Sequence, residues 1–326
     1  MKKLTIILPV YNGSASIERC LKSVFKQNYP NLEIIIVNDG STDNSEEIIS
    51  IIIEKAKRED TIYIHKENSG VADTRNYAIS IATGEYITFI DQDDIYAENY
   101  CSDYMKLVDG STDIIVGGYV RVDSNENEIY REHLTNETWS KYIVTAPWSH
   151  VYKKQFLLDN RIEFLESAIG EDVYFNILAY AYAENVKICE DELYFWTNNP
   201  ESVSNSKQAK ISEDVNPLFL LNSIYKRLPE LSGEKREYTE YYFIRYVVWY
   251  ILFTLKQSDW KDIKEKKKEL FCWLEKAYPK YENNKNIKLK YPKTDTFRNR
   301  VSVWLIMKAK KLYLDDFILK ILKRLL

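Results

Sequence analysis

Three carboxylates directly follow a short apolar segment in Tyr86–Asp94, Tyr-Ile-Thr-Phe-Ile-Asp-Gln-Asp-Asp. The aromatic and β-branched residues that begin this segment predict a strand buried on both faces. Asp91, Asp93 and Asp94 would lie at its carboxyl end, where their charge needs a cation or several hydrogen-bond donors. Carboxylate oxygens suit Mg²⁺ or Mn²⁺, which usually bridge one or two carboxylates to a ligand's phosphates. The segment therefore predicts a metal and phosphate site, with an acidic turn that caps a helix as the alternative.

The elements that must position these carboxylates alternate between strand and helix patterns. Apolar strands are expected at 4–10, 32–37, 61–65 and 86–91, with amphipathic helical patterns between them. Strands that are apolar throughout predict a parallel sheet with helices on both faces. Ligands of such sheets bind beyond the carboxyl ends of the strands, so the polar residues that follow each strand should converge on one edge.

The rest of the chain is less regular and ends in helices. The patterns predict one or two strands over 113–122, a polar loop over 123–138, a short connection over 148–158, a buried helix over 172–183 and a strand over 186–196. From about residue 206 only helical patterns remain. We therefore expect an α/β domain over 1–205 and a helical C-terminal region over 206–326.

Charge is distributed unevenly along the chain. The net charge is −4, but residues 285–326 carry 12 Lys and Arg against 3 Asp and Glu, which leaves −13 on the remainder. The last helical pattern has Leu314, Phe317 and Ile321 on one face and Lys320 and Lys323 opposite. Such a basic amphipathic helix lies on an anionic membrane surface or packs on its own domain with solvated lysines, and both interpretations stay open. No nucleic-acid partner is expected, because the body of the chain is acidic and lacks a nucleic-acid-binding motif.

The cysteines and apolar runs indicate the compartment. Cys20, Cys101, Cys189 and Cys272 are far apart and form no C-x-x-C pair, which argues for reduced thiols and against disulfides or a zinc site. The longest apolar run, 241–255, is too short and too polar to span a bilayer comfortably. We expect a cytoplasmic chain, and peripheral association with the inner face of the plasma membrane stays open.

Several short motifs point to one enzyme family. The chain lacks the glycine-rich sequences G-x-G-x-x-G and G-x-x-x-x-G-K, which argues against a Rossmann dehydrogenase or a P-loop enzyme. Five other motifs resemble, in order and spacing, those of glycosyltransferase family 2 over residues 1 to about 200. They are Leu8-Pro9-Val10-Tyr11-Asn12, Val37-Asn38-Asp39-Gly40-Ser41-Thr42-Asp43, Asn68-Ser69-Gly70 with Thr74-Arg75-Asn76, Phe89-Ile90-Asp91-Gln92-Asp93-Asp94 and Gly170-Glu171-Asp172.

This resemblance implies a GT-A fold and an inverting, metal-dependent transfer of a sugar from a nucleotide-sugar, most simply a UDP-sugar. Pro9 and Tyr11 would belong to the nucleotide site, with Tyr11 stacked on the base. Asp39 would bind the base or its ribose, and Arg75 the nucleotide or its phosphates.

The resemblance also implies the residues that carry the chemistry. Asp91-x-Asp93 is similar to the family's metal-binding DXD motif, with Asp93 as the direct ligand of Mn²⁺ or Mg²⁺ and Asp91 on the ribose and at the metal. Asp172, with Glu171 beside it, resembles the catalytic base. The acceptor would be a saccharide or a lipid-linked saccharide, in the synthesis of a bacterial capsule or another surface polysaccharide.

Each residue also has a structural interpretation. Asp39 could form an Asx turn, Arg75 a surface ion pair, and Glu171 and Asp172 could complement a helix dipole. Trp148 could stack on an acceptor sugar or lie in the core. At the level of the protein, the alternatives are a catalytically silent scaffold that binds nucleotide-sugar or membrane, and a nucleotidyltransferase, which would release pyrophosphate.

Overall fold

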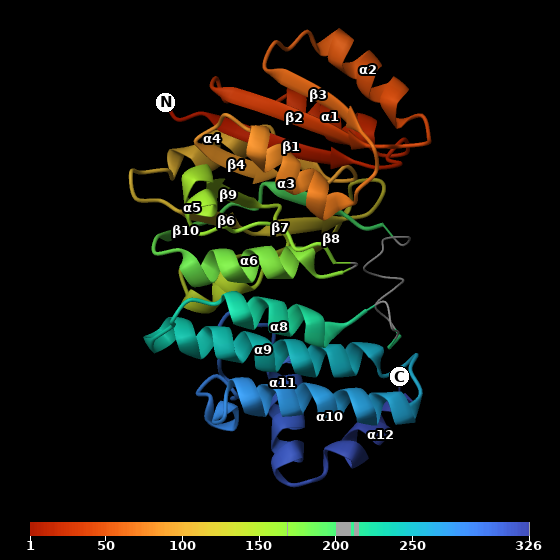
Figure 1. The fold of residues 1–326 in the computed structure, drawn as a ribbon, viewed down its shortest axis with the longest axis vertical. Coiled ribbons are helices and arrows are strands. Elements are labelled where there is room, and N and C mark those ends of the chain that lie inside the picture. Colours follow the sequence, from red (N-terminus) through yellow and green to blue (C-terminus); the bar gives the residue numbers. More distant parts are fainter. Residues whose placement is uncertain (168, 200–209, 212–214, 326) are drawn as a thin grey trace. The chain divides into compact units, whose positions relative to one another are not determined.

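The computed structural model describes residues 1–167, 169–199, 210–211 and 215–325. The chain divides into two compact units, which are considered separately (Figure 1). The α/β unit comprises residues 1–136 and 144–199, and the helical unit comprises 137–143 and 200–326. The short segment 137–143 thus groups with the later helices.

A seven-stranded sheet forms the centre of the α/β unit, in the order β10-β6-β9-β4-β1-β2-β3. All neighbouring pairs are parallel except those that β9 makes with β4 and β6. Every residue of β1, β2 and β4 is buried, as the apolar patterns predict. The mostly parallel sheet is confirmed. Its strands are β1 (Leu4–Val10), β2 (Leu32–Asp39), β3 (Thr61–Lys66), β4 (Tyr86–Phe89), β6 (Ile114–Gly117), β9 (His150–Lys153) and β10 (Val186–Cys189).

Helices cover both faces of this sheet because the chain adds strands first on one side of β1 and then on the other. From β1 the chain moves outward through β2 to β3, and it then returns past β1 to β4. Right-handed crossovers place the first two helices on one face and the third on the other. Accordingly, α1 (Ile17–Phe25) packs against α2 (Ser45–Ala56), whereas α3 (Val71–Ile81) packs against β1 and β2. The neighbours β1 and β4 therefore flank the topological switch point, where open α/β sheets bind ligands.

A second sheet departs from the expectations for residues 95–197. It has the order β5-β11-β7-β8 and joins β5 (Ile95–Tyr96), β7 (Tyr119–Val122), β8 (Glu128–Glu132) and β11 (Tyr194–Thr197). The loop expected over 123–138 is wrong, because it contains β8, whose side chains are almost all exposed and so lack an apolar pattern. The connection expected over 148–158 contains β9 and α5 (Lys154–Asp159), and the single strand expected over 186–196 is divided between the two sheets. The remaining helices of this unit are α4 (Tyr100–Lys106) and α6 (Glu171–Tyr182).

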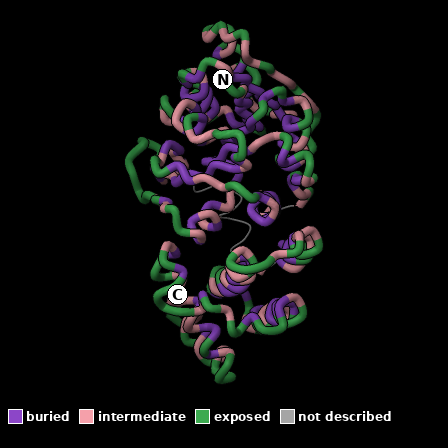
Figure 2. The backbone as a smooth tube through the Cα atoms, turned by 90° about the vertical axis from the view of Figure 1, so that its left-hand side faces the viewer, coloured by how far each residue is buried: buried purple, intermediate pink, exposed green. Residues whose placement is uncertain are grey.

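The helical unit is built around its longest helix, α9. This helix packs against α10, α11 and the short 3-10 turns η1 and η2. In η1, Trp139 is buried and its ring centroid lies 4.9 Å from that of Tyr241 on α9. Figure 2 shows helices with a buried and an exposed side, as expected for this region. The elements are η1 (Thr138–Tyr142), α8 (Pro217–Arg227), α9 (Gly233–Thr254), α10 (Trp260–Ala277), η2 (Tyr281–Asn283), α11 (Phe297–Lys311) and α12 (Asp315–Leu325).

The last helix, α12, packs on its own unit through the fully buried Leu319, and Lys320 is exposed, but Lys323 is not simply solvated. Lys323 donates hydrogen bonds to the carbonyl oxygens of Leu255 and Ser258, each at 2.7 Å, and is therefore directed toward the protein. Phe317 is 63% exposed and Ile321 41% exposed, so the apolar stripe largely faces outward. No helix among the described residues is both long and apolar enough to cross a membrane.

Candidate active site

Two loops are joined at the switch point, one after β1 and one after β4. The backbone N–H of Tyr11 donates to Gln92 Oε1 at 2.9 Å, and Gln92 Nε2 donates back to the Tyr11 carbonyl at 3.0 Å. Gln92 thereby fixes the loop that carries Tyr11 beside the turn that carries Asp91 and Asp93. The Tyr11 side chain is 48% exposed and free to stack on a planar ligand. Pro9 lies in β1, paired with Val37 of β2.

Asp39 ends β2 and organises the loop after β3. Its Oδ1 accepts from Lys66 Nζ at 2.8 Å and from the Ser69 N–H at 3.0 Å, and its Oδ2 accepts from the Gly70 N–H at 2.9 Å. Burial opposes ionisation, but these donors lower the pKa of Asp39 overall. The carboxylate is thus held in the charged form by the loop, with its side chain only 4% exposed.

Arg75 joins three carboxylates that lie far apart in the sequence. Its Nη2 lies 2.7 Å from Asp91 Oδ1, and its Nη1 lies 2.6 Å from Asp172 Oδ1 and 3.8 Å from Glu171 Oε1. The guanidinium carbon lies 5.1 Å from the centroid of the Phe164 ring. The Arg75 side chain is only 3% exposed, so it contacts acids inside the unit and is not a surface ion pair. These four charged side chains are called the Arg75 cluster.

The Arg75 cluster holds an excess of negative charge, and this changes the proton affinities. Burial raises the pKa of Asp172, Arg75 lowers it, and Glu171 and Asp91 raise it again, for a net rise to about 8. Because these carboxylates surround it, the pKa of Arg75 is raised although its burial acts in the opposite direction. The Asp172 side chain is 29% exposed, and burial with neighbouring negative charge raises the pKa of its carboxyl group.

The three acids after β4 have three different environments. Asp94 is buried and accepts hydrogen bonds from the Tyr194 hydroxyl at 2.5 Å and the Thr197 N–H at 2.8 Å, so it ties the turn to β11. Asp91 belongs to the Arg75 cluster. Asp93 is partly buried, and burial followed by the charge of Asp91 raises the pKa of its carboxyl group. The expectation that all three form one acidic group at the sheet edge is therefore too simple.

Asp93 is a candidate ligand for a divalent cation. Its raised pKa means that the surroundings disfavour its negative charge, which a bound cation would offset. Within the described residues, no group of three or more His, Cys, Asp and Glu side chains could hold a metal ion by itself. A cation here would therefore need oxygen atoms from a ligand, as Mg²⁺ commonly does with phosphates.

Two further aromatic residues, Trp148 and Tyr194, pack against each other next to the turn that carries Asp94. Trp148 is buried, and its ring stacks on that of Tyr194 with centroids 4.6 Å apart, which favours the core interpretation of Trp148.

Three residues of the site, Gln92, Lys66 and Tyr194, were not singled out in the sequence. Gln92 lies inside the acidic motif and could have been noticed there, whereas Lys66 and Tyr194 carry no local signal.

Comparison with known proteins identifies the family. A model described as glycosyl transferase family 2 matches residues 5–167, half of the chain. The glycosyltransferase GlyA of Streptococcus pneumoniae is 32% identical over 222 residues, which are 62% of this chain and 31% of GlyA. The chain thus spans about a third of the length of this relative.

Solved structures support the same fold. A crystal structure of S. aureus TarS in complex with UDP-GlcNAc superposes with a TM-score of 0.73 at 20% identity, covering 95% of this chain and 92% of that one. The mannosyltransferase PcManGT of Pyrobaculum calidifontis, in complex with GDP-Man and Mn²⁺, gives 0.50 at 15% identity, covering 99% and 84%. The predicted GT-A fold followed by a helical region is confirmed. With its matching motifs and this fold, the chain belongs to glycosyl transferase family 2.

Proposed function

We propose that this protein transfers a sugar from a nucleotide diphosphate donor, most simply a UDP-sugar, to a hydroxyl group of a saccharide or lipid-linked saccharide. The observation that carries the proposal is the Arg75 cluster, which joins Asp91 at the end of β4 to Asp172 at the start of α6 beside the switch point. The complexes of TarS with UDP-GlcNAc and of PcManGT with GDP-Man support a donor of this class.

The nucleotide would bind across the ends of β1, β2 and β4. The exposed ring of Tyr11 would stack on the base, next to Pro9. Asp39 would act at the base or ribose mainly by fixing the loop at Ser69 and Gly70, because its oxygens already accept three hydrogen bonds. Arg75 would act on the donor through Asp91, which it orients.

Asp93, with Asp91 nearby, would hold Mn²⁺ or Mg²⁺ together with the diphosphate oxygens of the donor. When bound, the cation supplies Lewis-acid stabilisation of the charge on the departing diphosphate. The Mn²⁺ in PcManGT supports this part of the proposal.

Asp172 would accept the proton of the incoming hydroxyl group as it attacks the anomeric carbon. A base works best when its pKa approaches the working pH, and burial with nearby negative charge raises that of Asp172 toward this range. Its hydrogen bond to Arg75 fixes the direction of the carboxylate, and Glu171 adds negative charge beside it. Attack opposite the leaving diphosphate inverts the anomeric centre, so one base suffices.

The family resemblance and the terminal helix support a proposal for the acceptor and the cellular setting. We place the enzyme in the synthesis of a bacterial capsule or another surface polysaccharide, at the inner face of the plasma membrane. The outward Phe317 and Ile321 of α12, together with the net positive charge of residues 285–326, suit contact with an anionic bilayer.

The decisive experiment is a panel of nucleotide-sugars incubated with Mn²⁺ or with EDTA, with nucleotide products separated by chromatography. We expect Mn²⁺-dependent release of nucleoside diphosphate from one donor, increased by a suitable saccharide acceptor. Release of pyrophosphate would instead identify a nucleotidyltransferase. No turnover with any common donor would favour the catalytically silent scaffold.

A further inference from the structure

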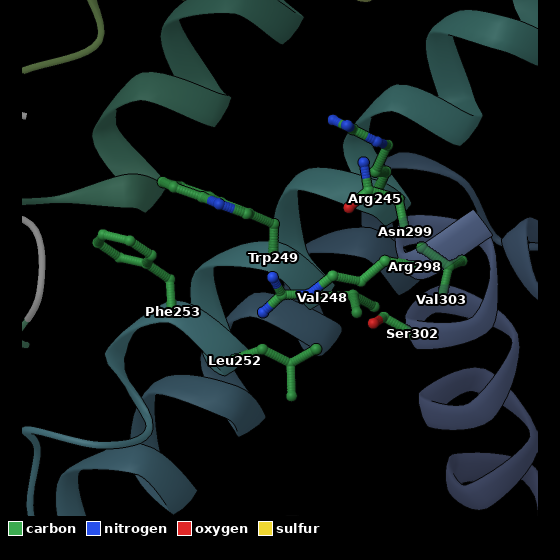
Figure 3. A pocket seen from close by; sticks show the side chains of 9 residues that line it. All are labelled: Arg245, Val248, Trp249, Leu252, Phe253, Arg298, Asn299, Ser302 and Val303. Carbon is green, nitrogen blue, oxygen red and sulfur yellow. The ribbon is translucent and has the colours of Figure 1, made fainter. Parts of the chain in front are cut away.

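The helical unit contains a pocket of about 370 Å³ between α9 and α11 (Figure 3). Arg245, Trp249 and Phe253 line it from α9, and Arg298, Asn299 and Ser302 line it from α11. All of these residues belong to one compact unit, so the pocket is formed within that unit. None of them takes part in the candidate active site.

One wall of the pocket is aromatic and partly open to solvent. The rings of Trp249 and Phe253 are stacked, with centroids 5.1 Å apart and planes inclined by 22°. Trp249 is 37% exposed and Phe253 is 38% exposed. Partly exposed aromatic faces of this kind bind flat apolar surfaces, including the C–H faces of sugar rings.

Two arginines also line the pocket, Arg245 from α9 and Arg298 from α11. Arg245 donates through Nε to Asp295 at 3.2 Å, which offsets its charge. Arg298 is exposed and, among the described residues, has no ion pair, and Figure 3 shows its guanidinium extending from α11 toward Trp249. Arg298 and Asn299 also lie in the first turn of the 15-residue helix α11, where the helix dipole adds positive potential. A planar guanidinium at this place suits a phosphate group.

We propose that this pocket binds a saccharide that carries a phosphate group, with the sugar against Trp249 and Phe253 and the phosphate on Arg298. Its volume of about 370 Å³ is large enough for a phosphorylated hexose. We expect this ligand to be part of the acceptor, and that assignment rests on the proposed function. Binding of the ligand to the pocket does not depend on it.

The test is calorimetric titration of the full chain with glucose 6-phosphate, glucose, inorganic phosphate and farnesyl phosphate. Glucose 6-phosphate is expected to bind at least tenfold more tightly than the other three. Arg298→Gln and Trp249→Ala should each weaken this binding at least fivefold. Lys308→Gln, an exposed cation on the same helix, and Phe297→Ala, an exposed aromatic residue outside the pocket, serve as matched controls and should leave it unchanged.

Three outcomes would overturn the proposal. Glucose 6-phosphate and inorganic phosphate could bind equally well, or farnesyl phosphate could bind more tightly than glucose 6-phosphate. The control variants could also lose as much binding as Arg298→Gln and Trp249→Ala. Arg298→Gln alters an exposed side chain, so it remains informative if Trp249→Ala lowers the melting temperature. Donor hydrolysis with Mn²⁺ is measured on the same samples. Intact hydrolysis without sugar-phosphate binding refutes this inference alone, whereas binding without any hydrolysis counts against the proposed function.

Discussion

Replacement of Asp172 by Asn separates proton transfer from donor binding. Asn keeps the size of the side chain, and its Oδ1 can still accept the hydrogen bond that Arg75 Nη1 now donates at 2.6 Å. The variant should therefore fold. The substitution removes one of the three carboxylates that face Arg75, and this loss is offset by weaker repulsion from Asp91 and Glu171.

The effect on catalysis should be much larger than the effect on stability. An amide cannot accept the proton of the acceptor hydroxyl group, and positioned general bases contribute about 10²- to 10⁴-fold to the rate. This range corresponds to about 3–5.5 kcal/mol in the activation barrier. We expect the rate of sugar transfer to fall by this factor, while the affinity for the donor, measured by competition with a fluorescent nucleotide in Mn²⁺, stays within about threefold.

Glu171→Gln is the matched control for this prediction. It removes one negative charge from the same cluster, but Glu171 lies farther from Arg75 Nη1, at 3.8 Å. Its transfer rate should fall less than tenfold. If Asp172→Asn retained more than a tenth of the wild-type rate, or if Glu171→Gln were the more damaged variant, the assignment of the base to Asp172 would be refuted.

Three further predictions concern the metal, the nucleotide and pH, and a fourth concerns the membrane. Asp93→Asn should raise the Mn²⁺ concentration needed for half-maximal donor binding at least tenfold, and an unchanged Mn²⁺ titration would exclude Asp93 as a ligand. Tyr11→Ala should weaken nucleotide binding by about 1–3 kcal/mol through lost stacking, without a change in melting temperature because the ring is 48% exposed; equal dissociation constants would refute the stacking. Since a base must be unprotonated and the pKa of Asp172 is raised to about 8, kcat/KM should increase with pH up to about that value, and a profile already flat from pH 5 would contradict the shift. Replacing Phe317 and Ile321 of α12 by Ser should release the protein from anionic liposomes in a sedimentation assay, and equal pelleting would rule out this contact.

Much of the α/β unit follows from local sequence. The apolar runs at β1, β2 and β4 are buried throughout, and alternation with helices was enough to predict a mostly parallel sheet. The strands that were missed lack such a signal. β8 is a mostly exposed strand. β9 lies between β4 and β6, and its pairing with these sequence-distant strands leaves no local pattern.

The site divides in the same way. The sequence alone determined which residues could form a charged site, because burying carboxylates at the ends of strands costs free energy unless a cation or hydrogen-bond donors are present. Only the tertiary structure decided their roles. Asp91 and Asp94 are three residues apart, yet Asp91 pairs with Arg75 of α3, whereas Asp94 is buried and accepts a hydrogen bond from Tyr194 of β11. Arg75 and Asp172 are 97 residues apart in the sequence, so only the folded chain brings them into contact. The sequence alone could name these groups, but their charge states depend on burial and neighbours that the fold supplies.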